Sequence, residues 1–278
     1  MGQQKNAPLK IGLIADPQYA DQDTKGSRFY RNSLSKLDSA TTAINATGVD
    51  FTVMVGDLVD VGTKDLTPAL RHLDKLKAPV YNLLGNHDYV DVKDGATLYK
   101  AYRMPAPYYT VERGHWLFIL LNTNELSEYA TSTTSAEHSA WQALNNQLKL
   151  EQRQNTQPWN GGISTQQLVW MEKQLKKAEK EAKNVIIFTH HPLFPENGFE
   201  TLNNRDILAV IEKYPRFKAV ISGHHHPGNF GNYKGIPMIT LEGMIETSNE
   251  NAYGVLELYL HRIDLKGQGR MTSRKFDF

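Results

Sequence analysis

The chain has 278 residues, of which 40% are hydrophobic and 22% are charged, as in an ordinary globular protein. Its net charge is only +1 and no long run of Lys or Arg occurs, which disfavours nucleic acid as a partner. Because cysteine is absent, disulfides, thiolate metal sites and cysteine nucleophiles are excluded, and no apolar run approaches the roughly 18 residues that a membrane span needs.

The first ten residues are polar and lack the apolar stretch of a secretory signal. The sequence therefore predicts a soluble protein without assigning its compartment. Two alternatives stay open: a cytoplasmic protein, and an exported protein whose signal peptide is missing from this sequence. The oligomeric state is open as well.

Eight short apolar runs recur along the chain. Most are nearly continuous in Val, Ile, Leu and Phe, the pattern of strands that are covered on both faces. In chain order they are Ile11–Ala15, Phe51–Val55, Val80–Leu84, Trp116–Leu121, Val185–Thr189, Ala219–Ser222, Met238–Leu241 and Val255–Leu260.

Helical patterns lie between several of these runs. Arg28–Ala46 is apolar along one face at helical spacing, which predicts a helix there. A second helix is expected to begin at Ser164, because Gln167 stands at the spacing of a capping box. The buried stripe of this second helix would be Leu168, Met171, Leu175 and Ala178.

The alternation of strands and helices predicts a layered α/β fold. We expect residues 1–278 to form a single domain, because neither an internal repeat nor a linker is found. Glu125–Gly162 is the exception to this regularity, since it is rich in Ser, Thr, Asn and Gln, with a helix expected over Ala136–Arg153. An insertion of this length is more often functional than accidental, so we expect a lid or wall that sets specificity.

Five polar clusters each follow directly on an apolar run. In open α/β sheets ligands bind outside the carboxyl ends of the strands, so these clusters should meet at one edge. Each cluster alone is a weak signal, but chance does not readily explain all five in this order. They are Asp16-Pro17-Gln18, Gly56-Asp57, Gly85-Asn86-His87-Asp88, His190-His191-Pro192 and Gly223-His224-His225-His226.

The order of these clusters resembles the calcineurin-like metallophosphoesterase superfamily, whose pattern is Asp-x-His, Gly-Asp, Gly-Asn-His-Asp/Glu, a later His, and Gly-His-x-His. The resemblance implies two packed β-sheets flanked by helices, with two divalent metal ions at the strand ends. Asp57 would bridge the two ions. The first ion would be held by Asp16, Gln18, Asp57 and His226, and the second by Asp57, Asn86, His190 and His224.

Carboxylate, amide and imidazole ligands without thiolate suit Mn, Fe or Zn, and Mg is a further candidate. Two such ions would clamp a phosphoryl group and acidify a shared water, whose bridging hydroxide would attack phosphorus. Asp16 and Asp57 give two negative charges against four from the ions, so the site would attract phosphate. His87 would stabilise the transition state or protonate the leaving group. Asp88 either orients His87 or is a simple turn residue.

Gln18 departs from the superfamily pattern, which has His at this position. A neutral amide should loosen the first site and shift its preference toward Mn²⁺. Alternatively, Gln18 only contacts a metal-bound water, or the first site is empty and the protein is a degenerate binder of phosphate ligands.

Gln18 also narrows the resemblance, because the manganese-dependent ADP-ribose/CDP-alcohol diphosphatase group carries Gln here. Five further segments resemble that group, and they extend the likeness to essentially the whole chain. They are Ile14–Asp21, Arg28–Leu34, Asn160–Ile163 with the Gln-Leu-x-Trp helix that follows, Leu241–Thr247 and Lys266–Arg270.

The resemblance implies hydrolysis of a pyrophosphate linkage in a nucleoside diphosphate conjugate such as ADP-ribose or CDP-choline. In the substrate pocket, Arg28 and Arg31 would reach phosphate, and Phe29, Tyr19 or Trp159 would stack on a base. Asn203 would hydrogen-bond the substrate. For each of these residues a solvated or core position is the alternative.

Two other functions stay open at this point. A cyclic-nucleotide or glycerophosphodiester phosphodiesterase would use the same metal centre with a differently shaped pocket. A phosphate-binding protein with a decayed centre would lack metal ligands, and here only Gln18 is unusual. A nuclease is disfavoured because no basic track accompanies the site.

Overall fold

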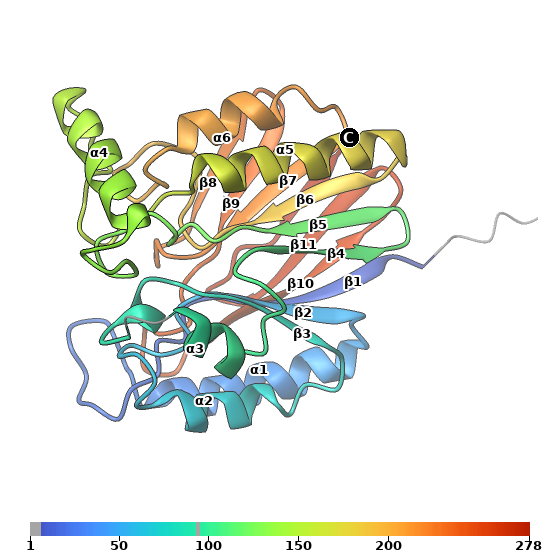
Figure 1. Ribbon diagram of the computed structural model, residues 1–278. Coiled ribbons are helices and arrows are strands. Elements are labelled where there is room, and N and C mark those ends of the chain that lie inside the picture. Colours follow the sequence, from blue (N-terminus) through green and yellow to red (C-terminus); the bar gives the residue numbers. More distant parts are fainter. Residues whose placement is uncertain (1–6, 93–94) are drawn as a thin grey trace, which may run out of the picture.

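The computed structural model describes residues 7–92 and 95–278, so most of the polar start considered above lies outside the described residues. Two six-stranded sheets pack face to face, with helices on their outer sides (Figure 1). Strand order is β12-β11-β10-β1-β2-β3 in the first sheet and β4-β5-β6-β7-β9-β8 in the second. This is the predicted layered α/β fold of two packed sheets.

The first sheet consists of β1 (Leu9–Ile14), β2 (Phe51–Val55), β3 (Val80–Leu83), β10 (Ala252–Leu258), β11 (Arg262–Gly269) and β12 (Arg274–Asp277). The second consists of β4 (Tyr109–Arg113), β5 (Trp116–Leu120), β6 (Asn184–Phe188), β7 (Phe217–Ser222), β8 (Asn229–Tyr233) and β9 (Ile236–Thr240). The helices are α1 (Asn32–Thr47), α2 (Leu66–Leu73), α3 (Gly95–Ala101), α4 (Ala136–Leu150), α5 (Thr165–Lys180) and α6 (Asn204–Ile211). No helix among these described residues is long and apolar enough to cross a bilayer.

Each of the eight apolar runs forms a strand, which confirms the strand predictions. Both β2 and β5 are buried at every residue, as expected of strands covered on two sides. The sequence missed β4, β8, β11 and β12, which lie at or next to the edges of the sheets. Strands near an edge leave one face to solvent, so polar residues interrupt their apolar pattern.

The helix predicted over Arg28–Ala46 begins later, at Asn32. The reason is tertiary, because the backbone of Arg28 forms a β-bridge with Glu246 and Phe29 N donates to Ile245 O at 3.1 Å. The start of the predicted helix therefore belongs to a contact between segments more than 200 residues apart.

The capping box at Ser164 forms only in half. Ser164 Oγ accepts from Gln167 N at 3.1 Å, as predicted. The Gln167 side chain instead donates to Asn122 O at 3.1 Å and to Glu125 Oε2 at 2.5 Å, and Glu125 takes the Ser164 N–H at 2.8 Å. The start of α5 is therefore tied to the first residue of the insertion Glu125–Gly162.

The parallel strands bring the five polar clusters to one end of the molecule. In the first sheet β1, β2 and β3 run parallel, and in the second β5, β6, β7 and β9 do. A buried apolar core lies between the sheets and includes Ile11, Phe51, Phe118 and Ile221. Packing of the two sheets thus places the carboxyl ends of both parallel sets side by side.

Glu196, in the loop after β6, should make the stability of the fold depend on pH. Glu196 accepts from Arg205 Nε and from a second Arg205 nitrogen, each at 2.8 Å, and these hydrogen bonds lower the pKa of Glu196 to about 2. The charged pair should stabilise the fold by about 1 kcal/mol after solvent screening. That contribution is complete above the ordinary pKa of 4.5 and is lost as pH falls toward 2.

We therefore expect Glu196→Gln to be less stable than the wild type near neutral pH, by about 1 kcal/mol. The gap should shrink as the pH is lowered from about 4.5 toward 2. Urea denaturation at a series of pH values measures it, and a gap that does not change with pH would contradict the prediction.

Candidate metal centre

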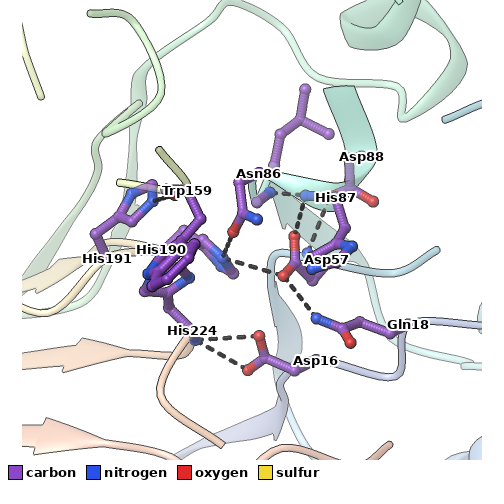
Figure 2. Close-up of polar contacts among 12 residues, drawn as sticks. Asp16, Gln18, Asp57, Asn86, His87, Asp88, Trp159, His190, His191 and His224 are labelled. Atoms are coloured by element: carbon purple, nitrogen blue, oxygen red, sulfur yellow. Dashed lines mark hydrogen bonds and ion pairs between the residues drawn. The ribbon is translucent and has the colours of Figure 1, made fainter. Parts of the chain in front are cut away.

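Side chains from all five clusters meet at the carboxyl ends of the strands (Figure 2). Asp57 Oδ2 lies 3.0 Å from Gln18 Nε2 and 3.3 Å from His190 Nε2. His190 Nε2 in turn lies 3.2 Å from Asn86 Oδ1. The predicted ligand residues of both metal ions therefore surround Asp57, although they come from the loops after β1, β2, β3 and β6.

His224 and His226 close the cluster from the loop after β7. The backbone N–H of His224 donates to both carboxylate oxygens of Asp16, at 3.0 and 3.1 Å. His226 Nε2 lies 3.8 Å from Asp16 Oδ1 and 3.1 Å from Gln18 Nε2. All seven predicted ligand residues are buried, each with less than a tenth of its surface exposed.

Four residues of the cluster have a left-handed backbone, which is uncommon outside glycine. The φ angles are 50° at Asp16, 42° at Gln18, 53° at Asp57 and 70° at His224. Each such conformation costs of order 1 kcal/mol and persists only where the surrounding structure enforces it. Four of them in one buried cluster indicate a functional site that the fold holds in place.

Gly85 is needed because the chain passes very close to Asp57. A Cβ at this position would lie 2.1 Å from Asp57 Oδ1 and 2.5 Å from His190 Cε1. Any other residue would push these two side chains away from each other. Steric crowding therefore explains why the Gly-Asn-His-Asp cluster begins with glycine.

The pKa values of the buried acidic and basic groups show how strongly their charges interact. Burial by itself would raise the pKa of Asp57, but the charges of His190 and His87 outweigh it and hold the pKa well below its ordinary value. Burial likewise would lower the pKa of His190, yet Asp57 raises it to about 9. For Asp16 burial prevails over His226 and raises the pKa to about 6. Such a cluster is suited to cations.

One nitrogen of each histidine in the cluster is already committed to a protein acceptor. His190 Nδ1 donates to Val55 O at 3.0 Å, and His224 Nε2 lies 3.0 Å from Asn160 Oδ1. His226 Nδ1 lies 2.8 Å from Glu246 Oε1. The remaining nitrogens are Nε2 of His190, Nδ1 of His224 and Nε2 of His226, and each would offer its lone pair to a metal ion that takes the place of a proton.

Gln18 has a buried oxygen with no hydrogen-bond partner, Oε1. Its Nε2 points between Asp57 and His226, and a half-turn of the amide would bring Oε1 to the same place. An orphaned buried oxygen is costly unless a partner is supplied, and a cation would be one. The donor set of carboxylate, amide oxygen and imidazole therefore fits two divalent metal ions.

The structure corrects the role given to Asp88. Its carboxylate accepts from the backbone N–H groups of Asp57 and Gly85, both at 2.9 Å, from Val59 N at 3.3 Å and from Tyr102 Oη at 2.6 Å. Asp88 therefore braces the loops after β2 and β3 and does not orient His87.

Asp60, which the sequence analysis did not select, lies beside His87 instead. The His87 ring Nδ1 donates to Asp60 O at 3.1 Å and lies 3.0 Å from Asp60 Oδ1. Burial lowers the pKa of His87, but the charges of Asp57 and Asp60 outweigh it and raise the pKa to about 9. His87 is thereby held as a cation at the cavity wall.

A cavity of about 390 Å³ opens over the cluster, a size typical of small-molecule sites. Arg28 and Trp159, two of the residues expected to contact substrate, line this cavity, and the centroid of the Phe199 ring lies 6.5 Å from that of Trp159. The residues that line the cavity are Gln18, Arg28, Asp57, Asn86, His87, Trp159, Phe199, His224 and His226.

Three predicted substrate contacts have other roles in the structure. Arg31 forms ion pairs with Asp21 and Asp23, both at 2.6 Å, outside the cavity. The backbone of Phe29 pairs with Ile245, and its ring does not line the cavity. Asn203 holds the end of the insertion, because it bonds Ile163 N at 3.1 Å and Ile163 O at 2.9 Å.

Four residues that contact the cluster were missed: Asp60, Asn160, Phe199 and Glu246. Asn160 and Glu246 stand in segments that carry the family resemblance, so a signal existed for both. Asp60 and Phe199 gave no signal that distinguished them. His191 is not among the predicted ligands. Its ring centroid lies 4.4 Å from that of His224, and its nitrogens are hydrogen-bonded to Thr123 and Trp159.

Two packed sheets with a buried set of carboxylates, amides and imidazoles at the strand ends define a metal-dependent phosphoesterase. Residues 9–228 match the calcineurin-like phosphoesterase family. The chain therefore belongs to this family, which uses two divalent metal ions, and it is a metal-dependent hydrolase.

Named relatives cover almost the whole chain. A manganese-dependent ADP-ribose/CDP-alcohol diphosphatase of Xenopus tropicalis is 29% identical, over 95% of this chain and 92% of the relative. The human protein of the same name is 28% identical, over 97% and 93%. A solved dimetal phosphatase from Danio rerio superposes with a TM-score of 0.89 at 26% identity, covering 98% of this chain and 99% of that one.

Proposed function

We propose that this chain hydrolyses the pyrophosphate linkage of a nucleoside diphosphate conjugate, of the ADP-ribose or CDP-alcohol type, with two Mn²⁺ ions. One observation carries the proposal: the candidate metal ligands, a cationic arginine and two aromatic rings face the same cavity. The relatives align with 95% and 97% of this chain, and their names support the same substrate class.

In this proposal Asp16, Gln18, Asp57 and His226 would hold the first ion. Asp57, Asn86, His190 and His224 would hold the second. When bound, two divalent cations neutralise phosphoryl oxygens and acidify water. The protein contributes the charge balance, because its two carboxylates would leave the loaded site positive toward phosphate.

Three side chains at the cavity would act on the substrate. Protonated His87 would donate a hydrogen bond to the phosphoryl group or a proton to the leaving oxygen. Arg28 would bind a phosphate, for which its planar guanidinium is suited. The Trp159 ring, 41% exposed, would stack on the nucleobase, with Phe199 extending the aromatic wall.

We further propose that the whole chain acts as one domain, in which Glu125–Gly162 is a specificity wall. The insertion delivers Trp159 to the cavity and Asn160 to His224. Its two ends are joined by the Leu126–Gly162 bridge, so the segment is held against the site.

The test is a panel of ADP-ribose, CDP-choline, a cyclic mononucleotide and an aryl phosphate, each with Mn²⁺, Mg²⁺, Zn²⁺ or chelator. We expect Mn²⁺-dependent cleavage that favours the two pyrophosphates. Preference for the cyclic or monoester substrate would leave the metal centre and overturn the substrate. Absence of hydrolysis with every metal would overturn the enzyme.

Trp159→Ala should raise the KM for ADP-ribose by roughly ten- to a hundredfold, because a stacked base contributes about 1–3 kcal/mol. Its effect on kcat should be small, since Trp159 is far more exposed than the buried cluster. Steady-state kinetics on ADP-ribose and on inorganic pyrophosphate, which has no base, separate the two contributions. Equal KM increases on both would contradict base stacking.

A further inference from the structure

The three histidines of the metal centre differ in what orients them. His190 is held by a backbone carbonyl and His224 by the neutral amide of Asn160. The Asn160 amide cannot turn around, because its Nδ2 donates to Asn155 O and Gly198 O at 2.9 and 2.8 Å. Among these three histidines, only His226 has a charged group on the nitrogen that faces away from the metal centre, the carboxylate of Glu246.

The contact between His226 and Glu246 is close and well shielded. Oε1 of Glu246 lies 2.8 Å from His226 Nδ1, and the two side chains are 13% and 7% exposed. His226 Nε2, on the opposite side of the ring, faces Gln18 at 3.1 Å.

The segment that carries Glu246 is anchored by two basic side chains, the buried Lys36 and the half-buried Arg270. The Lys36 ammonium donates to the carbonyls of Met244, Glu246 and Thr247, at 2.9, 2.7 and 2.6 Å. Arg270 donates to Gly243 O at 2.9 Å and lies 3.4 Å from His226 O. These contacts involve Leu241–Thr247 and Lys266–Arg270, two of the segments that carry the family resemblance. Neither segment has a role in the proposed catalysis.

The segment also packs directly against the imidazole. A Cβ at Gly243 would lie 2.9 Å from His226 Cγ and Cδ2, and Ile245 N donates to Asp16 O at 2.9 Å. The segment that carries the carboxylate is thus in direct contact with both the His226 ring and the loop of Asp16.

We propose that Glu246 is a positioning residue for the metal site that contains Gln18, where it fixes His226 and strengthens its Nε2 as a ligand. A carboxylate on the far nitrogen of a histidine raises the basicity of the ligating nitrogen. The effect falls on the site that needs it, because Gln18 supplies a neutral amide where another imidazole would bind more strongly. This inference rests on the metal centre of the proposed function.

The test is titration of metal-free protein with Mn²⁺ by calorimetry, with bound Mn counted by mass spectrometry. Glu246→Gln keeps the shape and an acceptor oxygen but removes the charge, and Glu246→Ala removes both. We expect one of the two affinities to fall roughly tenfold in Glu246→Gln and roughly a hundredfold in Glu246→Ala, while the other stays unchanged.

Glu242→Gln is the matched control. Glu242 is also buried on the segment Leu241–Thr247, but its Oε1 accepts from Thr272 Oγ1 at 2.6 Å instead of from a histidine. We expect this variant to bind both ions as the wild type does. An equal loss in the control, equal weakening of both sites, or wild-type binding in both Glu246 variants would overturn the inference.

The titration separates this inference from the proposed function. A wild type that binds two Mn²⁺ ions but cleaves no pyrophosphate disproves the substrate, and the Glu246 variants still decide the inference. A wild type that binds no Mn²⁺ overturns both.

Discussion

Asp57→Asn should reduce the rate of hydrolysis by more than about a hundredfold. Loss of a residue that only supports a metal ligand costs up to about a hundredfold, and loss of a ligand itself should cost more. Asp57 lies at the centre of the cluster, within 3.3 Å of Gln18 and His190, and its backbone is strained into a left-handed conformation. The substitution removes the charge that both metal ions would share. Hydrolysis of ADP-ribose with saturating Mn²⁺ measures the loss.

The variant should still fold. The amide oxygen of the substituted side chain can accept from His87 N as the carboxylate does, and the backbone bonds of residue 57 to Gln18 and Asp88 remain. A cooperative thermal transition of metal-free protein checks this. Asp74→Asn, which breaks only a surface ion pair with Arg103, is the control and should keep full activity. Wild-type activity of Asp57→Asn with two ions bound would disprove the two-metal centre.

His87→Asn should lower kcat by about 10²–10⁴-fold while two metal ions remain bound. The ring lines the cavity, and its Nδ1 is occupied by the carbonyl of Asp60, so Nε2 is the nitrogen available to substrate. Metal content by mass spectrometry and kcat on ADP-ribose measure the two halves of the prediction.

The leaving group distinguishes the two roles of His87. If His87 donates a proton, the loss should be much smaller for an activated aryl ester, whose leaving group needs no proton. If it only stabilises charge on the phosphoryl group, both substrates should lose equally. His261→Asn, at an exposed histidine, is the control, and an undiminished kcat in His87→Asn would contradict either role.

Much of the molecule follows from local sequence. The continuous apolar runs predicted every strand that is buried on both faces, and the polar cluster after each of five runs predicted which loops form the site. This worked because double burial leaves an unbroken apolar pattern and because parallel strands end at a common edge. The side chains of Asp57, His190 and His224 lie together as that reasoning expects.

The supporting contacts could not be read in the same way. Asp88 and Asp60 are both acidic, yet the first bonds the backbone of two loops and the second contacts the His87 ring. Which carboxylate takes which role depends on where the loops after β2 and β3 turn. Arg28 and Arg31 likewise have different roles that the sequence does not distinguish. Arg28 lines the cavity, whereas Arg31 forms ion pairs with Asp21 and Asp23.

The α/β class and the residue types of a phosphate-directed metal centre can be predicted from the chain alone, because strand periodicity and ligand chemistry are local properties. The contacts that hold the ligands in place cannot be predicted in this way. Glu246 meets His226 across 20 residues, and Lys36 meets Glu246 across 210. Contacts between segments this distant are set by how the two sheets pack, and no local pattern in the chain encodes them.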